Sequence, residues 1–241
     1  EIVGKIDEEG AKDLPMNVTV EKRLTKAELA DVLESAHDFV HYIGHCEEDG
    51  LRCRNGNLSV SGITDSNVQT FFLNACGSYY EGRELVKKGS VAGAVTFTKV
   101  LNKQAAKVGV AFSRLLIQGY DIAHAIQLAR RRIMMGKDYA VVGDGTHKLT
   151  QSDNRFPIIG TLEESNNQYE VEYTTLSMPN IGGVYEVYLD GKEKPRLQGT
   201  KSTFTLSDSE LLSFLERAKA PFVYDGDLFW SEELSERIRD C

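Results

Sequence analysis

The chain has 241 residues, of which 41% are hydrophobic and 27% are charged, a composition typical of a globular protein with a substantial core. Its net charge of −8 argues against a protein that binds a nucleic-acid backbone, because such proteins carry basic surfaces. No apolar stretch approaches the ~20 residues that a membrane-spanning helix requires, and no signal peptide is recognisable. We therefore expect neither a membrane nor a nucleic acid as a partner.

The four cysteines, Cys46, Cys53, Cys76 and Cys241, follow no disulfide or metal-binding spacing. A chain of this length does not depend on disulfides for its stability, so we expect reduced thiols and a cytoplasmic location. Because the sequence begins at Glu1 rather than at a methionine, we also expect it to be part of a longer polypeptide.

The first elements lead to a histidine. Residues 16–24 alternate valines with polar residues, which predicts a strand near a sheet edge. Thr25 and Glu28 match a capping box and predict a short helix after them. A short apolar strand is expected over residues 38–43, and the chain reaches His45 two residues later.

The next elements lead to a cysteine. Asn55 and Gly56 predict a turn between two short strands within residues 51–60, which would form a small hairpin beside the histidine. Residues 69–75 are then a short apolar run that ends at Cys76. Such a run is typical of a central strand that is buried on both faces.

Helices and strands alternate from the cysteine to about residue 144. Helices are expected at residues 81–88, 102–118 and 121–133, and strands at residues 91–97 and 139–144. This alternation predicts an α/β domain with a mostly parallel sheet, three layers deep.

The pattern changes near residue 150, where we place a boundary between domains of residues 1–150 and 151–241. Residues 155–206 have no helical pattern but contain several alternating stretches that predict strands. Ser207 and Glu210 match a second capping box, followed by a helix, a last strand and a charged tail. We expect a small β-rich (α+β) C-terminal domain of unknown role.

His45 and Cys76 are expected at the carboxyl ends of two parallel strands, where open α/β sheets bind their ligands. Adjacent strands lie about 4.8 Å apart, so side chains at their ends can meet. A histidine can hold a nearby cysteine as the reactive thiolate, which makes the two residues a candidate base and nucleophile. The backbone N–H groups of Cys46 and Cys76 are candidates to bind the oxyanion. Alternatively, Cys76 is a small buried hydrophobic residue and His45 a hydrogen-bonded turn residue.

Several motifs in unbroken order resemble one family. The motifs are HYIGH at residues 41–45, FFLNACGS at 71–78, GRELVKKGSVAGAVTF at 82–97, AIQLARRRIM at 125–134 and YAVVGD at 139–144. They resemble a CHAT domain, a caspase-like peptidase related to caspases, separases and gingipains, over about residues 16–150. The resemblance implies a caspase-type fold in which His45 is the general base and Cys76 the nucleophile of a thiol endopeptidase. It implies no cofactor, and it implies regulation by a partner protein or a fused sensor domain.

The chain departs from the family pattern in three places. Cys46 follows the histidine where the family usually has glycine, which puts a side chain beside the expected oxyanion position. Asn74 stands two residues before the cysteine, where metacaspase-like relatives have an aspartate that binds a basic substrate side chain. A complete caspase-type sheet usually has a further strand and helix before residues 16–24.

Two further interpretations, a substrate cleft and a zinc site, concern the residues around His45. The acidic side chains of Glu47 and Asp49 could line a substrate cleft and attract a basic side chain, or they could belong to a solvated loop. His41 and His45 would lie about 13 Å apart in a strand at ~3.3 Å per residue, so they cannot share one zinc ion, and we expect no metal site.

These patterns together predict a cytoplasmic, caspase-like cysteine endopeptidase that cleaves protein or peptide substrates with His45 and Cys76. The alternative is a catalytically inactive domain of the same fold that serves as an interaction or scaffold module. A nucleotide-binding protein is a weaker alternative, because the chain lacks the glycine-rich motifs that bind phosphate groups.

Overall fold

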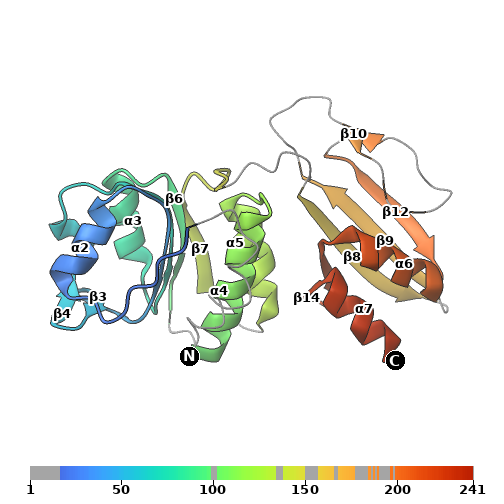
Figure 1. Ribbon diagram of the computed structural model, residues 1–241, viewed down its shortest axis with the longest axis horizontal. Helices are drawn as coiled ribbons and strands as arrows, with labels where there is room; N and C mark the ends of the chain where they lie inside the picture. Colours follow the sequence, from blue (N-terminus) through green and yellow to red (C-terminus); the bar gives the residue numbers. More distant parts are fainter. Residues whose placement is uncertain are drawn as a thin grey trace. The chain divides into compact units, whose positions relative to one another are not determined.

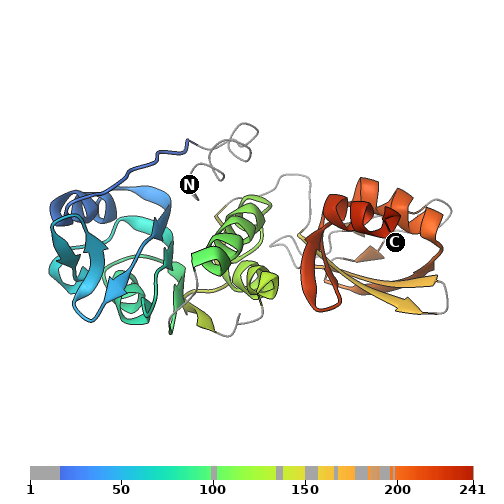
Figure 2. The ribbon, with the colours of Figure 1, turned by 90° about the horizontal axis from the view of Figure 1, so that it is seen from below.

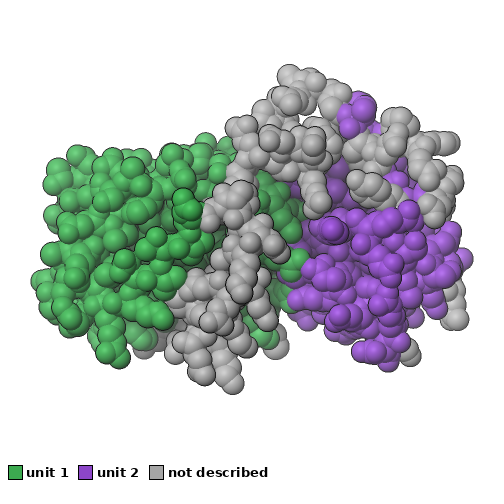
Figure 3. All heavy atoms as spheres, viewed as in Figure 1, with its two compact units in different colours: residues 1–151 green, residues 152–241 purple. Residues whose placement is uncertain are grey.

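The computed structural model describes residues 17–98, 102–133, 138–149, 157–165, 168–176, 184–185, 187, 189, 196–197 and 199–240. The chain forms two compact units, Glu1–Gln151 and Ser152–Cys241, which are distinguished by colour in Figure 3. Each unit has its own sheet and its own helices, and each is described separately below.

Unit 1 alternates strands and helices along most of its length. Its elements are α2 (Lys26–Glu34), β1 (His37–Ile43), β2 (Cys46–Glu47), β3 (Gly50–Cys53), β4 (Gly56–Leu58), the 3-10 helix η1 (Val60–Gly62), β5 (Val68–Asn74), α3 (Tyr79–Lys87), β6 (Ala92–Thr96), α4 (Asn102–Ile117), α5 (Ile122–Ala129), the 3-10 helix η2 (Arg130–Arg132) and β7 (Tyr139–Gly143). The predicted capping box is present, since the Thr25 side chain accepts from the Glu28 N–H and the Glu28 carboxylate accepts from the Thr25 N–H.

The main sheet of unit 1 has the strand order β1-β5-β6-β7. Strands β1, β5 and β6 run parallel, and β7 runs antiparallel to β6. Successive side chains of β5 point to opposite faces, as the pleat requires. Phe71 and Leu73 pack in a core with α2 and α3, whereas Phe72 contacts Phe112 of α4, with ring centroids 4.9 Å apart. Helices therefore cover both faces of the sheet, as Figure 1 also shows.

A second, three-stranded sheet, β2-β3-β4, follows directly after β1. The predicted hairpin is confirmed, but its two-residue turn is formed by Arg54 and Asn55, one position earlier than expected. Asn55 Oδ1 accepts from the Lys26 N–H at 2.8 Å. The hairpin is thereby attached to the start of α2.

The strand predicted at residues 16–24 is wrong for the described residues 17–24, which form no strand. The side chains of Val18 and Val20 remain 53% and 38% exposed. Alternation creates a strand only when one face can be buried against a sheet, and this segment pairs with no strand among the described residues.

Unit 2 is a five-stranded sheet with two helices. Its elements are β8 (Ile158–Ser165), β9 (Gln168–Thr175), β10 (Val184–Tyr185), β11 (Arg196–Leu197), β12 (Lys201–Leu206), α6 (Asp208–Ala218), β13 (Pro221–Tyr224), β14 (Asp227–Trp230) and α7 (Ser231–Arg239). The strand order is β12-β9-β8-β13-β14, and β10 and β11 form a separate pair. Figure 2 shows α6 and α7 over the same face of the sheet.

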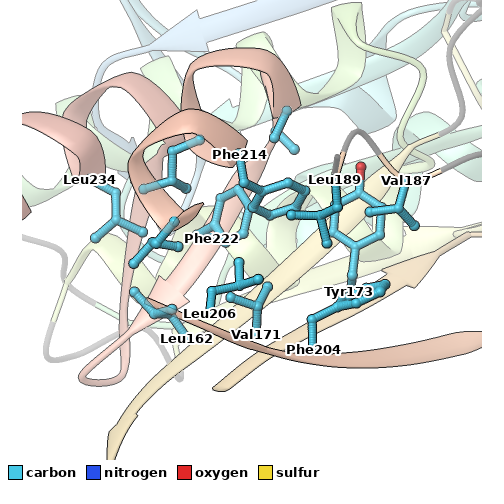
Figure 4. Packing of buried hydrophobic residues seen from close by; sticks show 14 residues of the cluster. Leu162, Val171, Tyr173, Val187, Leu189, Phe204, Leu206, Phe214, Phe222 and Leu234 are labelled. Atoms are coloured by element: carbon cyan, nitrogen blue, oxygen red, sulfur yellow. The ribbon is translucent and has the colours of Figure 1, made fainter. Parts of the chain in front are cut away.

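The core of unit 2 lies between this sheet and α6. Phe214 of α6 packs edge-on against Tyr173 of β9 and Phe222 of β13, with ring centroids 5.6 and 5.9 Å away (Figure 4). The expected charged tail is ordered, since residues 227–239 form β14 and α7. The reason is that Leu228, Trp230 and Leu234 are almost fully buried.

None of the helices in the described part of the chain combines the length and the apolar character that a membrane crossing demands.

Candidate active site

The parallel pair of β1 and β5 determines where the histidine and the cysteine lie. The two strands pair in register up to Ile43 and Asn74, their last residues. His45 and Cys76 each follow two residues beyond that last pair, at the same edge of the sheet. Two residues that are 31 positions apart in the sequence thus leave the sheet beside each other.

The backbone of His45 is held by two neighbouring groups while its side chain is exposed. Its carbonyl oxygen accepts from the Arg52 N–H at 2.9 Å and lies 2.9 Å from the Tyr42 hydroxyl. A side chain on Gly44 would overlap this hydroxyl, because a Cβ there would lie 2.6 Å from Tyr42 Oη. Glycine at position 44 therefore allows the tyrosine to brace the turn that presents His45.

Cys76 is half-buried in a tight turn between β5 and α3. The Ser78 hydroxyl donates to the Leu73 carbonyl at 2.7 Å, and the Thr96 hydroxyl donates to the Ala75 carbonyl. Gly77 has a φ of 71°, in the left-handed region that favours glycine. The turn is thus fixed on both sides of the cysteine by β5 and β6.

Cys46 directly follows His45 and is the first residue of β2. Its half-buried side chain packs against the core formed with α2 and α3, which accommodates a residue larger than glycine after His45. Burial raises the pKa of the Cys46 thiol to about 11, and Glu81, Glu47, Cys76 and Asp49 raise it further in that order. The interaction with Cys76 means that residues next to His45 lie within electrostatic range of the Cys76 thiol.

The backbone N–H of Cys46 points away from β3. Cys46 pairs with Leu51, and the hydrogen bond beside this pair runs from the Arg52 N–H to the His45 carbonyl. In an antiparallel ladder this arrangement identifies a non-hydrogen-bonded pair, whose own N–H groups face outward.

The acidic residues after the histidine take part in the small hairpin. Glu47 forms an exposed ion pair with Arg52, at 2.8 Å, and Asp49 accepts from the Asn57 side chain at 2.5 Å. Both contacts are exposed, as expected for a solvated loop. Neither bond directs its carboxylate toward Cys76.

Asn74 lies on the opposite side of the strand from Leu73 and faces α4. Its Nδ2 donates to the Ala105 carbonyl at 2.9 Å, and the residue is 4% exposed. His41 lies on the same face and stacks on Phe72, with ring centroids 4.9 Å apart. Burial lowers the pKa of His41 to about 4, so its ring is neutral at pH 7.

Two buried residues that were not expected from the sequence lie near the cysteines, Glu81 near Cys46 and Tyr139 near Cys76. Glu81 of α3 accepts from the Val60 N–H at 2.5 Å, and burial is the main cause that raises its pKa. Tyr139 of β7 is 2% exposed, and its pKa is raised first by burial and then by Cys76. For Glu81, the usable signal in the sequence was a glutamate at the third position of the helix that follows Cys76. Nothing in the sequence indicated Tyr139, because it belongs to a strand 63 residues after Cys76.

A groove of about 1460 Å³ runs along the outer edge of β1. Its walls include residues 17–21, the whole of β1 and three residues of α4, and it extends to His45 but not to Cys76. Within the described ranges, no three His, Cys, Asp or Glu side chains gather as a metal site would require.

No family model matches the chain, and no curated protein matches it either. Among solved structures, the chain is similar to a complex of the pro- and mature domains of RgpB from Porphyromonas gingivalis. The identity is 15% and the TM-score 0.45, over 77% of this chain and 51% of that one. The chain therefore spans about half the length of the structure it matches, and the case for its site rests on geometry alone.

Proposed function

We propose that this chain is a cysteine endopeptidase with a three-layer, caspase-like domain of the CHAT type at residues 1–150. The observation that carries the proposal is the register of β1 and β5, which brings His45 and Cys76 to one edge of the sheet. A base and a thiol on adjacent strand ends are the minimum that thiol-dependent peptide cleavage requires.

In the proposed reaction, His45 takes the proton of Cys76, and the thiolate attacks the carbonyl carbon of the substrate. An S–C bond forms, the C–N bond breaks, and the protonated His45 gives its proton to the leaving amine. Water then attacks the thioester while His45 accepts its proton, which releases the acid product and restores the thiol. All atoms and protons are balanced without a cofactor.

The oxyanion of each tetrahedral intermediate would accept from the N–H groups of Cys46 and Cys76. The outward orientation of the Cys46 N–H favours this role, because such a donor is free of the β2–β3 ladder. The Cys46 thiol is not a competing nucleophile near pH 7, since its pKa is about 11.

The wider setting is part of the same proposal. The peptidase would act in the cytoplasm on protein or peptide substrates, and a regulatory protein or a fused sensor domain would control it. Residues 151–241 would then be a separate domain with a role of its own, which agrees with their independent hydrophobic core.

Thiol labelling tests the proposal. Iodoacetamide, followed by peptide mass spectrometry, should alkylate Cys76 at least about 10-fold faster than Cys53, because an adjacent base raises the thiolate fraction. Burial raises the pKa of Cys53, which makes this half-buried thiol the internal reference. The excess should vanish in His45→Ala. Equal rates at the two cysteines would instead favour the inactive interaction domain.

A further inference from the structure

Two aromatic side chains are exposed at the edge of the main sheet that carries Cys76. Tyr80 is 73% exposed and Phe97 is 52% exposed, and no other phenylalanine, tyrosine or tryptophan side chain in the described part of the chain is exposed. Single exposed apolar residues are ordinary in folded proteins, whereas a contiguous group of them marks a binding surface. What these two side chains mean therefore depends on whether they belong to one group.

Both exposed rings contact a third ring, that of Tyr79. The Tyr79 centroid lies 5.5 Å from that of Tyr80 and 4.8 Å from that of Phe97. Tyr79 and Tyr80 begin α3, whereas Phe97 directly follows β6, so two separate elements form one continuous aromatic surface. We call Tyr79, Tyr80 and Phe97 the aromatic patch.

The aromatic patch lies beside the proposed nucleophile, because hydrogen bonds join the neighbours of Phe97 to the neighbours of Cys76. The N–H of Gly77, the residue after the cysteine, donates to the Thr98 carbonyl at 3.3 Å. The carbonyl of the residue before the cysteine accepts from the Thr96 hydroxyl. The turn that carries the cysteine is thus fixed against the end of β6. An extended peptide advances only about 3.3 Å per residue, so a substrate held at the cysteine has side chains within reach of the patch.

The surroundings of the aromatic patch favour an apolar ligand. The Arg83 guanidinium lies 5.7 Å from the centroid of the Tyr79 ring, where it would repel a lysine or arginine side chain. An acidic side chain would gain only an ion pair with Arg83, which is exposed, and exposed ion pairs contribute little. A large apolar side chain instead removes its own surface and that of the rings from water.

We propose that the aromatic patch is the subsite for a large apolar side chain of the substrate, such as that of phenylalanine or leucine. This side chain belongs to the residue whose carbonyl Cys76 attacks or to the residue before it, because the acyl part of the substrate stays attached to the cysteine while the leaving part departs. The inference rests on the proposed function and names its substrate class.

Peptidyl acyloxymethyl ketones, which alkylate cysteine nucleophiles, test the inference on the full chain. One series of alanine-based probes carries Ala, Leu, Phe, Glu or Lys at the residue of the reactive ketone, and a second series carries them at the residue before it. The rate of Cys76 labelling is measured by mass spectrometry. In at least one series the Phe and Leu probes should react about 10-fold or more faster than the Ala, Glu and Lys probes. Equal rates throughout, or fastest labelling by a Glu or Lys probe, would overturn the inference.

Variants of the aromatic patch show whether these rings cause the preference. In Tyr80→Ser and in Phe97→Ser, the ratio of the Phe-probe rate to the Ala-probe rate should fall at least about 3-fold. Val110→Ser should keep the ratio, because Val110 is 43% exposed on α4 and is not part of the patch. An unchanged ratio in both patch variants would overturn the inference. Should Phe97→Ser fail to fold, Tyr80→Ser remains decisive, since the Tyr80 side chain is 73% exposed.

Iodoacetamide, which has no peptide part, separates failure of the inference from failure of the proposed function. If Cys76 reacts with iodoacetamide in a His45-dependent way and the apolar probes show no advantage, only the inference fails. If Cys76 reacts no faster than Cys53 with iodoacetamide, the proposed function fails and the inference fails with it. A His45-dependent reaction together with an advantage of the apolar probes would support both.

Discussion

Replacing His41 by leucine should make unit 1 much less sensitive to acid. His41 is half-buried at the groove along β1, with its ring stacked on Phe72, and burial lowers its pKa from 6.5 to about 4. The folded state therefore holds the neutral ring, whereas the unfolded chain binds a proton once the pH falls below about 6.5. Stability from this group is present above pH ~6.5 and is lost as the pH falls toward 4.

The size of the effect follows from the difference between the two pKa values. At about 1.36 kcal/mol per pKa unit, the full loss is about 3.4 kcal/mol, of which about 2 kcal/mol is lost between pH 7 and pH 5. His124 acts in the opposite direction, because its bond to Asp121 raises its pKa and stabilises the folded state at low pH. Comparing His41→Leu with the unmodified chain cancels this and all other titrating groups.

Hydrogen exchange of β5 amides, read by mass spectrometry at pH 5, 6 and 7, is the suitable assay. The single tryptophan, Trp230, belongs to unit 2 and cannot report on unit 1. After correction for intrinsic exchange rates, the opening free energy should fall by about 2 kcal/mol more in the unmodified chain than in His41→Leu. The same dependence on pH in both proteins would refute the assignment of a neutral His41 with a lowered pKa.

Two further predictions concern packing and capping. Gly82→Ala should destabilise unit 1 by about 1–3 kcal/mol in denaturant unfolding followed by circular dichroism, because the new Cβ would lie 2.3 Å from Val95 Cγ1. Gly62→Ala is the matched control, since its Cβ would meet nothing within 4 Å, and an equal loss in both would contradict the packing argument. Ser207→Ala should cost unit 2 about 1 kcal/mol by removing the cap of α6, measured by Trp230 fluorescence, and an unchanged midpoint would refute it.

Much of unit 1 was predictable because its signals are local. A capping box needs only two residues that are three positions apart, and Thr25 with Glu28 marked the start of α2 correctly. The apolar residues Phe71, Phe72 and Leu73 identified β5, because a strand that is buried on both faces carries apolar residues at successive positions. The candidate base and nucleophile came from similar signals, since each lies two residues after the end of a predicted strand.

Local signals failed where the outcome depended on a distant partner. Residues 17–24 alternate as a strand does, but they pair with no strand among the described residues. The direction of β7 was equally hidden, because an apolar run is compatible with parallel or antiparallel pairing. Residues 227–239 fold as β14 and α7 because Leu228, Trp230 and Leu234 can be buried in the core of unit 2.

The sequence by itself determined the strands, the helices and the two residues proposed to carry the chemistry, because hydrophobic period and capping act over a few residues. Only the tertiary structure decided what surrounds Cys76. His41, Asn74 and Tyr139 come from three strands and share one face only after the sheet has assembled. Which strands pair is a property of the folded chain, and no pattern along the chain records it.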